Sequence, residues 1–178
     1  MSWQPKLNLL PLAPFRRNVR AVIERDFASA LAHFAPDMEL ANFMGIYTAR
    51  AERDAYPVLN LLPLGNDPAI DDDNASNERK RLLVEAEHFG RDADVLIEEL
   101  EYYLVALRSV LLEMTEEDLI KYIQVELPNG YRYRDDFRWT VGTERFGERS
   151  YESENSFVQV ASLILTLEYM EVETTSDD

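Results

Sequence analysis

The chain of 178 residues contains no cysteine. This absence excludes disulfide bonds, thiolate chemistry and cysteine-based zinc sites, and it is typical of a cytosolic protein. The first residues lack the cationic start and unbroken apolar run of a signal peptide. No apolar stretch of the sequence approaches the ~20 residues needed to cross a bilayer. We therefore expect a soluble intracellular protein that does not associate with membranes.

Positive charge is scarce, and lysine is especially rare. Lys and Arg total 18 against 34 Asp and Glu, which gives a formal net charge of −16. Such a surface is repelled by nucleic-acid phosphates, so we expect no direct sequence-specific binding of nucleic acid. Apart from Lys6, Lys80 and Lys121 every cation is arginine, which is favoured in buried and interfacial ion pairs. Self-association through ion pairs and simple solubility both remain open as explanations.

Histidine is also rare, and the sequence offers no motif for a metal, a cofactor or catalysis. Asp71-Asp72-Asp73 lacks the glycine and the distal glutamate of a calcium-binding loop, which favours a solvated loop. His33 suits the end of a helix, where a cation interacts well with the dipole. His88 has Glu85 and Glu87 nearby, but in a strand their side chains point to the opposite face. We therefore expect no metal, no cofactor and no enzymatic activity.

Hydrophobic residues make up 46% of the chain, which is enough for the core of a single domain over residues 1–178. Apolar residues at helical spacing predict a helix over Phe15–Phe34 and a second from Asp92 or Asp94 to about Met114. Strands are predicted at Glu39–Tyr47, Ala55–Leu64, Lys80–Phe89, Trp139–Phe146 and Phe157–Glu173. The predicted fold class is α+β, with a mixed or antiparallel sheet of four to five strands and two main helices packed on one face.

The remaining segments are predicted to be mostly irregular. Residues 1–13 form an extended N-terminal arm, residues 65–79 a mobile acidic loop and residues 174–178 a frayed acidic tail. Pro57 and Pro63 place the Ala55–Leu64 strand at an edge of the sheet or at a strand end.

A capping box is predicted at Thr115–Asp118, ahead of a short helix over Leu119–Ile123. A brief strand over Ile123–Leu127 is the alternative. Pro128-Asn129-Gly130 is typical of a turn.

Arginine and aromatic residues are interleaved near the end of the chain. This combination stacks on single-stranded nucleic acid, and it also dominates protein interfaces. The net charge and the adjacent Asp135 and Asp136 favour a protein interface. Its predicted contact residues are Tyr131, Arg132, Tyr133, Arg134, Phe137, Arg138 and Trp139. We expect Arg134→Glu to weaken assembly.

The two predicted helices carry faces of opposite charge. The two sets are Arg16, Arg17 and Arg20 of the first helix and Glu98, Glu99 and Glu101 of the second. A closed ring repeats one heterologous interface, which requires complementary patches on two parts of one chain. These sets are candidates for such patches. For any single residue, a solvated helix face is the alternative.

The order of the predicted elements is informative as a whole. Tyr56-Pro57 opens a strand ahead of a polar loop, and the strand Leu82–Glu85 runs through Gly90-Arg91-Asp92 into the second helix. The last strand is long and ends at Leu165–Tyr169. This pattern, over about residues 15–169, resembles the tail terminator (tail completion) family of tailed bacteriophages and related head–tail joining proteins. Thr115–Arg138 is longer than the family's counterpart, so a different neck or tail component is an alternative.

The resemblance implies a structural virion protein. Members of the family form a ring, commonly a hexamer, that caps the tail tube and offers a surface to the head connector. It therefore implies a homo-oligomer that assembles in the host cytoplasm, resides in the tail or neck, and has tail-tube and head-connector proteins as partners. An anionic lumen would let DNA pass without gripping it. The alternative from another class is an acidic monomeric or dimeric binding or inhibitor protein that mimics nucleic acid.

Overall fold

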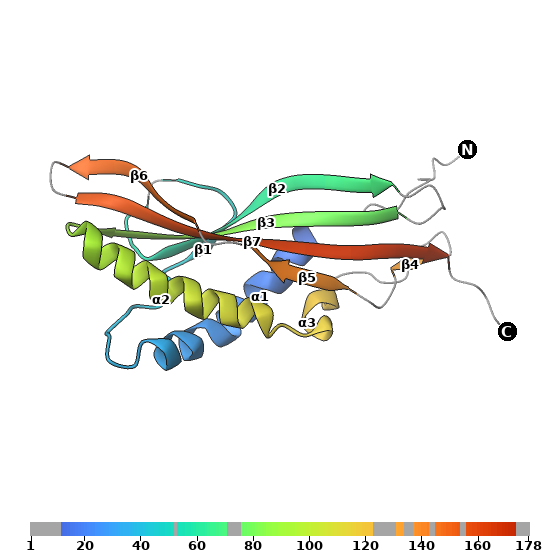
Figure 1. Ribbon diagram of the computed structural model, residues 1–178, viewed down its shortest axis with the longest axis horizontal. Coiled ribbons are helices and arrows are strands. Elements are labelled where there is room, and N and C mark those ends of the chain that lie inside the picture. Colours follow the sequence, from blue (N-terminus) through green and yellow to red (C-terminus); the bar gives the residue numbers. More distant parts are fainter. Residues whose placement is uncertain are drawn as a thin grey trace.

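The protein packs one layer of helices against one sheet, as Figure 1 shows. The computed structural model describes residues 12–51, 53–70, 76–122, 131–133, 137–142, 145–153 and 156–173. Helices α1 (Leu12–Phe34) and α2 (Ala93–Leu112) lie on the same face of the sheet and contact each other. This arrangement confirms the predicted α+β class.

The helices begin where their capping residues predict. Asp92 caps α2, because its side chain accepts from the backbone N–H groups of Asp94 and Val95 at 3.1 and 3.3 Å. Thr115 and Asp118 form the predicted capping box, each side chain accepting from the other's backbone N–H. Because α3 follows this cap directly, it occupies Glu116–Ile120, earlier than the predicted short helix.

The sheet has seven strands, more than the predicted four to five. They are β1 (Ile46–Tyr47), β2 (Val58–Ile70), β3 (Ser76–Gly90), β4 (Tyr131–Tyr133), β5 (Arg138–Val141), β6 (Arg145–Ser153) and β7 (Ser156–Glu173). Strand β1 runs parallel to β2, and every other pairing is antiparallel. The long strand β7 pairs with β3 on one side and with β4, β5 and β6 in turn on the other.

The single strand predicted over Trp139–Phe146 is two strands, β5 and β6. Gly142 separates them and donates its backbone N–H to the Ile164 carbonyl at 2.6 Å. A Cβ atom on Gly142 would lie 3.2 Å from that same carbonyl oxygen, so the close approach favours glycine. The register with β7 also shifts between the two strands, because Val141 and Arg145 are four residues apart while their partners Leu165 and Ser162 are three apart.

The prediction of a mobile loop over residues 65–79 is wrong for the part that the structure describes. Strand β2 continues to Ile70 and β3 begins at Ser76. The two strands pair along this part, from Asn66 opposite Lys80 to Ile70 opposite Ser76. A bulge between Pro63 and Asn66 carries the ladder past the proline. Ladder hydrogen bonds join backbone groups, so polar side chains do not prevent the pairing. Residues 71–75, including the three aspartates, lie outside the described residues.

The predicted strand Glu39–Tyr47 is also mostly wrong, because only Ile46–Tyr47 pairs with a neighbour. Leu40 and Phe43 pack against the core, and the Tyr103 hydroxyl donates to the Ala41 carbonyl. These tertiary contacts override the alternating pattern. At the N-terminus, α1 begins at Leu12 inside the predicted arm. The rest of that arm, residues 1–11, lies outside the described residues, as do the predicted turn 128–130, the alternative strand 123–127 and the tail 174–178.

The core lies between the helices and one face of the sheet. The buried helical side chains include Phe15, Val19, Phe27, Leu100, Tyr103, Leu104, Leu107 and Leu111. The buried strand side chains are Leu59, Leu61, Leu82, Val84, Ala86, Ala161, Leu163, Leu165 and Leu167. Burial of each large apolar side chain contributes about 1.5–3 kcal/mol. Side chains alternate along a strand, so the intervening residues lie on the opposite face, here termed the second sheet face.

Candidate protein interface

The two aromatic residues at the end of the arginine and aromatic segment pack with the core. Phe137 is buried at 5% exposure and belongs to the core. Trp139 packs against that core, and its indole N–H donates to the Leu111 carbonyl at 3.0 Å. Both aromatic side chains therefore contribute apolar surface to the packing beside α2, and their interface role stays a prediction. Arg138 is exposed.

The rest of that segment is described only in part. Strand β4 consists of Tyr131, Arg132 and Tyr133. Its backbone pairs in that order with Glu173, Val172 and Glu171 of β7. Arg134 lies outside the described residues. The interface role of these four residues stays a prediction.

The predicted cationic face of α1 is partly neutralised within the chain. Arg17 and Arg20 are exposed and Arg16 is half-buried. Arg20 forms an ion pair with Glu24 one helical turn later, at 2.7 Å. Exposed ion pairs one helical turn apart contribute only about 0.3–0.5 kcal/mol to stability, so this pair holds the Arg20 side chain only weakly.

The three predicted glutamates of α2 have different environments. Glu98 and Glu101 are exposed. Glu99 instead turns towards the sheet, where it accepts a hydrogen bond from Nε2 of His88 at 2.8 Å. This pairing removes Glu99 from the outer surface. Glu99 lies one helical turn before Tyr103, which is buried. Residues at this spacing share one face of a helix, so the sequence already indicated that Glu99 faces inward.

The environment of His88 is unfavourable for its charged form. Burial lowers the pKa of His88 below its ordinary value of 6.5, against the opposing effect of Glu99. Among the described residues its Nδ1 atom is buried and has no hydrogen-bond partner. A second proton on the ring would therefore leave an unsatisfied buried donor. Glu85 and Glu87 lie on the opposite face, as predicted from strand alternation.

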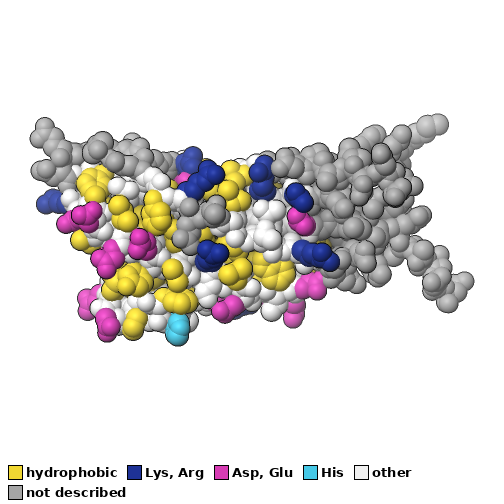
Figure 2. Space-filling model, viewed as in Figure 1, with side chains coloured by type: hydrophobic (Ala, Val, Ile, Leu, Met, Phe, Trp, Pro, Cys, Tyr) yellow, Lys and Arg dark blue, Asp and Glu magenta, His cyan; other side chains and the backbone are white. Residues whose placement is uncertain are grey.

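The outer surface of α2 is the most apolar exposed helix surface among the described residues. Ile97, Val105 and Leu112 are 36%, 42% and 54% exposed, although each is a large hydrophobic side chain. They alternate with Glu98 and Glu101 along the helix. Figure 2 shows yellow and magenta side chains side by side over the region of α2. Exposed apolar surface rimmed by charge is typical of a protein contact. These five residues are termed the α2 outer face.

The second sheet face holds a buried polar cluster. Arg50 binds Glu85 through two contacts, Nη2 to Oε2 at 2.6 Å and Nε to Oε1 at 2.8 Å. These hydrogen bonds raise the pKa of Arg50. Asn60 donates through Nδ2 to Glu87, and more weakly to Glu85 at 3.5 Å. The cluster holds the segment between β1 and β2 against the sheet, and it compensates two buried carboxylates.

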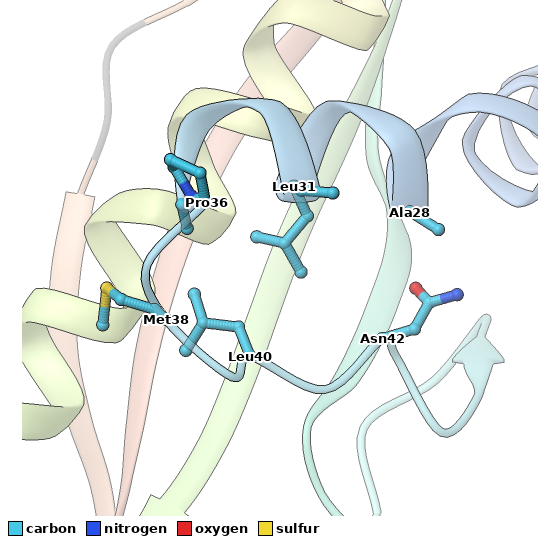
Figure 3. Close-up of a pocket in the computed structure, with 8 residues that line it drawn as sticks. Ala28, Leu31, Pro36, Met38, Leu40 and Asn42 are labelled. Atoms are coloured by element: carbon cyan, nitrogen blue, oxygen red, sulfur yellow. The ribbon is translucent and has the colours of Figure 1, made fainter.

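A shallow apolar groove lies between the end of α1 and the segment that follows it, as Figure 3 shows. It has a volume of about 200 Å³. Its lining residues are Ala28, Leu31, Ala32, Ala35, Pro36, Met38, Leu40 and Asn42. Ligand pockets typically measure about 300–1,000 Å³, so this groove is of the size of one side chain.

Within the described ranges, no three acidic or histidine side chains come together as metal ligands. No helix in the same part of the chain is both long and apolar enough to span a membrane.

No family model and no curated protein sequence matches the chain. Among solved structures, the chain is similar to a chain from the virion of a native gene transfer agent particle. That similarity has a TM-score of 0.45 at 14% sequence identity, and it covers 87% of this chain and 93% of that chain.

Proposed function

We propose that this protein is a structural component of a tailed-phage virion. In this proposal it acts as a tail terminator or tail completion protein, forming a ring at the end of the tail tube and joining it to the head connector. Part of the element order on which the family resemblance rests supports this proposal. Strand β3 leads through Gly90 and the Asp92 cap into α2. The long strand β7 is the last strand along the chain.

The single observation that carries the proposal is the α2 outer face. Ile97, Val105 and Leu112 lie along one side of a well-capped helix, so they share a fixed surface. A contact with another protein would remove this apolar area from water, at about 25 cal/mol per Å². In a ring, the partner is the next copy of the same chain.

In this proposal the protein works by assembly, without making or breaking covalent bonds. Its partners are further copies of itself, the tail-tube protein and the head-connector protein. The net charge of −16 suits a ring through which DNA passes, because like charge prevents the phosphates from binding its wall.

Native mass spectrometry of the purified chain over a range of concentrations tests this proposal. We expect a closed multimer near six copies, seen as rings by electron microscopy. Val105→Asp combined with Leu112→Asp should reduce the mass to that of smaller species, because charge is placed on the contact surface. Met44→Asp is the matched control, since Met44 is 62% exposed, lies just before β1 and is not part of the α2 outer face.

Two results would overturn the proposal. One is a single-chain mass for the wild-type protein at every concentration. The other is a monomer or dimer that competes with DNA for a nucleic-acid-binding protein, which is the behaviour of an acidic mimic. Circular dichroism of each variant verifies that a change in mass does not arise from unfolding.

A further inference from the structure

Acidic side chains are concentrated in one part of the helical layer. The described segment 91–121, which includes α2 and α3, contains nine Asp and Glu against three Arg and Lys, a net charge of −6. Figure 2 shows acidic side chains over the region of α2 and a group of basic side chains near the middle of the view, next to the strands. Five arginines lie on the second sheet face: the strand register places four of them, and a contact with Glu85 places the fifth.

The register places these arginines on the second sheet face. Arg79 and Arg81 alternate along β3 with Leu82 and Val84, which face the core. Arg79 is 59% exposed and contacts Glu168 at 2.8 Å.

The neighbouring strands add two more arginines. Arg138 of β5 lies opposite Glu168, and Arg145 of β6 lies opposite Ser162. Both partners alternate with core residues of β7, so both arginines share the second sheet face, and both are exposed. Arg50, the fifth, reaches this face to bind Glu85 and keeps 47% of its side chain exposed.

The same face also offers apolar area. Leu62, Leu83 and Ile164 lie directly opposite one another across β2, β3 and β7. All three are half-buried, so part of each side chain meets solvent. The second sheet face thus combines an apolar row with flanking arginines, and the α2 outer face combines an apolar row with flanking glutamates.

We infer that the α2 outer face of one copy packs across the second sheet face of the next copy. The inference rests on the proposed ring and names the two surfaces that form its repeated contact. Each copy uses each surface once, which is the arrangement of a heterologous interface that closes by rotation. Glutamates then face arginines while the two apolar rows are removed from water.

Packing of faces is favoured over pairing of strand edges. Strand β2 borders the sheet beyond its short pairing with β1, and Pro63 and Pro68 lie in this outer part. A proline has no backbone N–H to donate, so a strand added there would lack donors at these positions. The sequence predicted an edge strand or a strand end; among the described residues β1 borders β2 only at Leu59 and Asn60, so Pro63 lies where no further strand pairs with β2.

Charge reversal tests the inference. Arg138→Glu with Arg145→Glu should raise the dissociation constant for self-association at least about tenfold, and so should Glu98→Arg with Glu101→Arg. An equimolar mixture of the two variants should regain the wild-type mass, because each reversed face then meets a complementary one. Arg17→Glu with Arg20→Glu is the matched control on α1 and should keep the wild-type mass.

The outcomes separate this inference from the proposed function. A multimer that the sheet variant leaves intact but the α1 variant dissociates would overturn the inference and keep the ring. Variants that fold, dissociate and fail to re-associate when mixed would also overturn it. A wild-type protein that is a single chain at every concentration would instead overturn the proposed function.

Discussion

Asn18 is the residue whose replacement tests most directly how the helical layer is held together. It lies in α1 and is only 1% exposed. Its side-chain amide donates to the Leu119 carbonyl, and its side-chain oxygen accepts from the Tyr122 backbone N–H at 3.1 Å. The last carbonyl groups of a helix have no partner within the helix. Asn18 therefore satisfies the end of α3 from a different helix.

We expect Asn18→Leu to lower the free energy of unfolding by about 2–4 kcal/mol. Leucine fills a similar volume, so the cost arises from hydrogen bonding and not from a cavity. Each lost hydrogen bond contributes about 0.5–1.5 kcal/mol, and a buried carbonyl left without a partner costs about 1–3 kcal/mol. Tyr122 is 48% exposed, so water can replace the bond to its N–H. The Leu119 carbonyl therefore dominates the cost.

Urea unfolding followed by circular dichroism measures this change. Asn42→Leu is the matched control, because Asn42 is exposed and its side chain accepts a local hydrogen bond from the adjacent Phe43 N–H, at 2.9 Å. Its free energy of unfolding should remain within about 1 kcal/mol of the wild-type value. If Asn18→Leu also remains in that range, the bonds from α1 to α3 do not stabilise the domain and the reasoning is wrong.

Three further changes probe the ion pairs. Arg50→Ala should lower the free energy of unfolding by about 1–3 kcal/mol in urea, because Glu85 stays buried, and Arg50→Lys should recover only part of the loss. The folded pKa of His88 lies below 6.5, so the unfolded chain takes up a proton first and stability should fall as pH drops below 6.5. His88→Gln should reduce that slope in urea midpoints measured against pH. The pKa of Asp118 is lowered to about 2, chiefly by an arginine hydrogen bond, so its contribution is present above 3.8 and lost towards 2. Asp118→Asn should show less loss over that range by thermal unfolding.

The helices could be predicted from the sequence because their signals are local. Apolar residues from Phe15 to Leu31 recur at helical spacing, and Asp92 and Thr115 provide caps whose hydrogen bonds involve residues at most three positions away. Interactions of this range are encoded in neighbouring residues. The same holds for β2 as an edge strand, since proline restricts the strand that contains it.

The hairpin and the surfaces could not be predicted in the same way. The pairing of Asn66 with Lys80 continues a ladder whose other end pairs Val58 with Glu87, several residues away on each strand. Phe137 and Trp139 have a composition that suits both an interface and a core, and only the packing of α2 beside β5 brings them against the core. Likewise, the grouping of arginines on the second sheet face requires the register of β7 with three other strands.

The proposed contact between copies depends on the distance between the α2 outer face and the second sheet face within one chain. A helix is about 10 Å across and packs roughly 10 Å from a sheet, so the α2 outer face and the second sheet face of one chain lie more than one Debye length apart in about 0.1 M salt. Glu98 and Arg138 therefore cannot neutralise each other within a single copy. Contact with a second copy brings such groups together, and it does so without altering the core. In the proposed assembly the interface can then form and separate while each domain stays folded, because the hydrophobic core lies between the helices and the other face of the sheet.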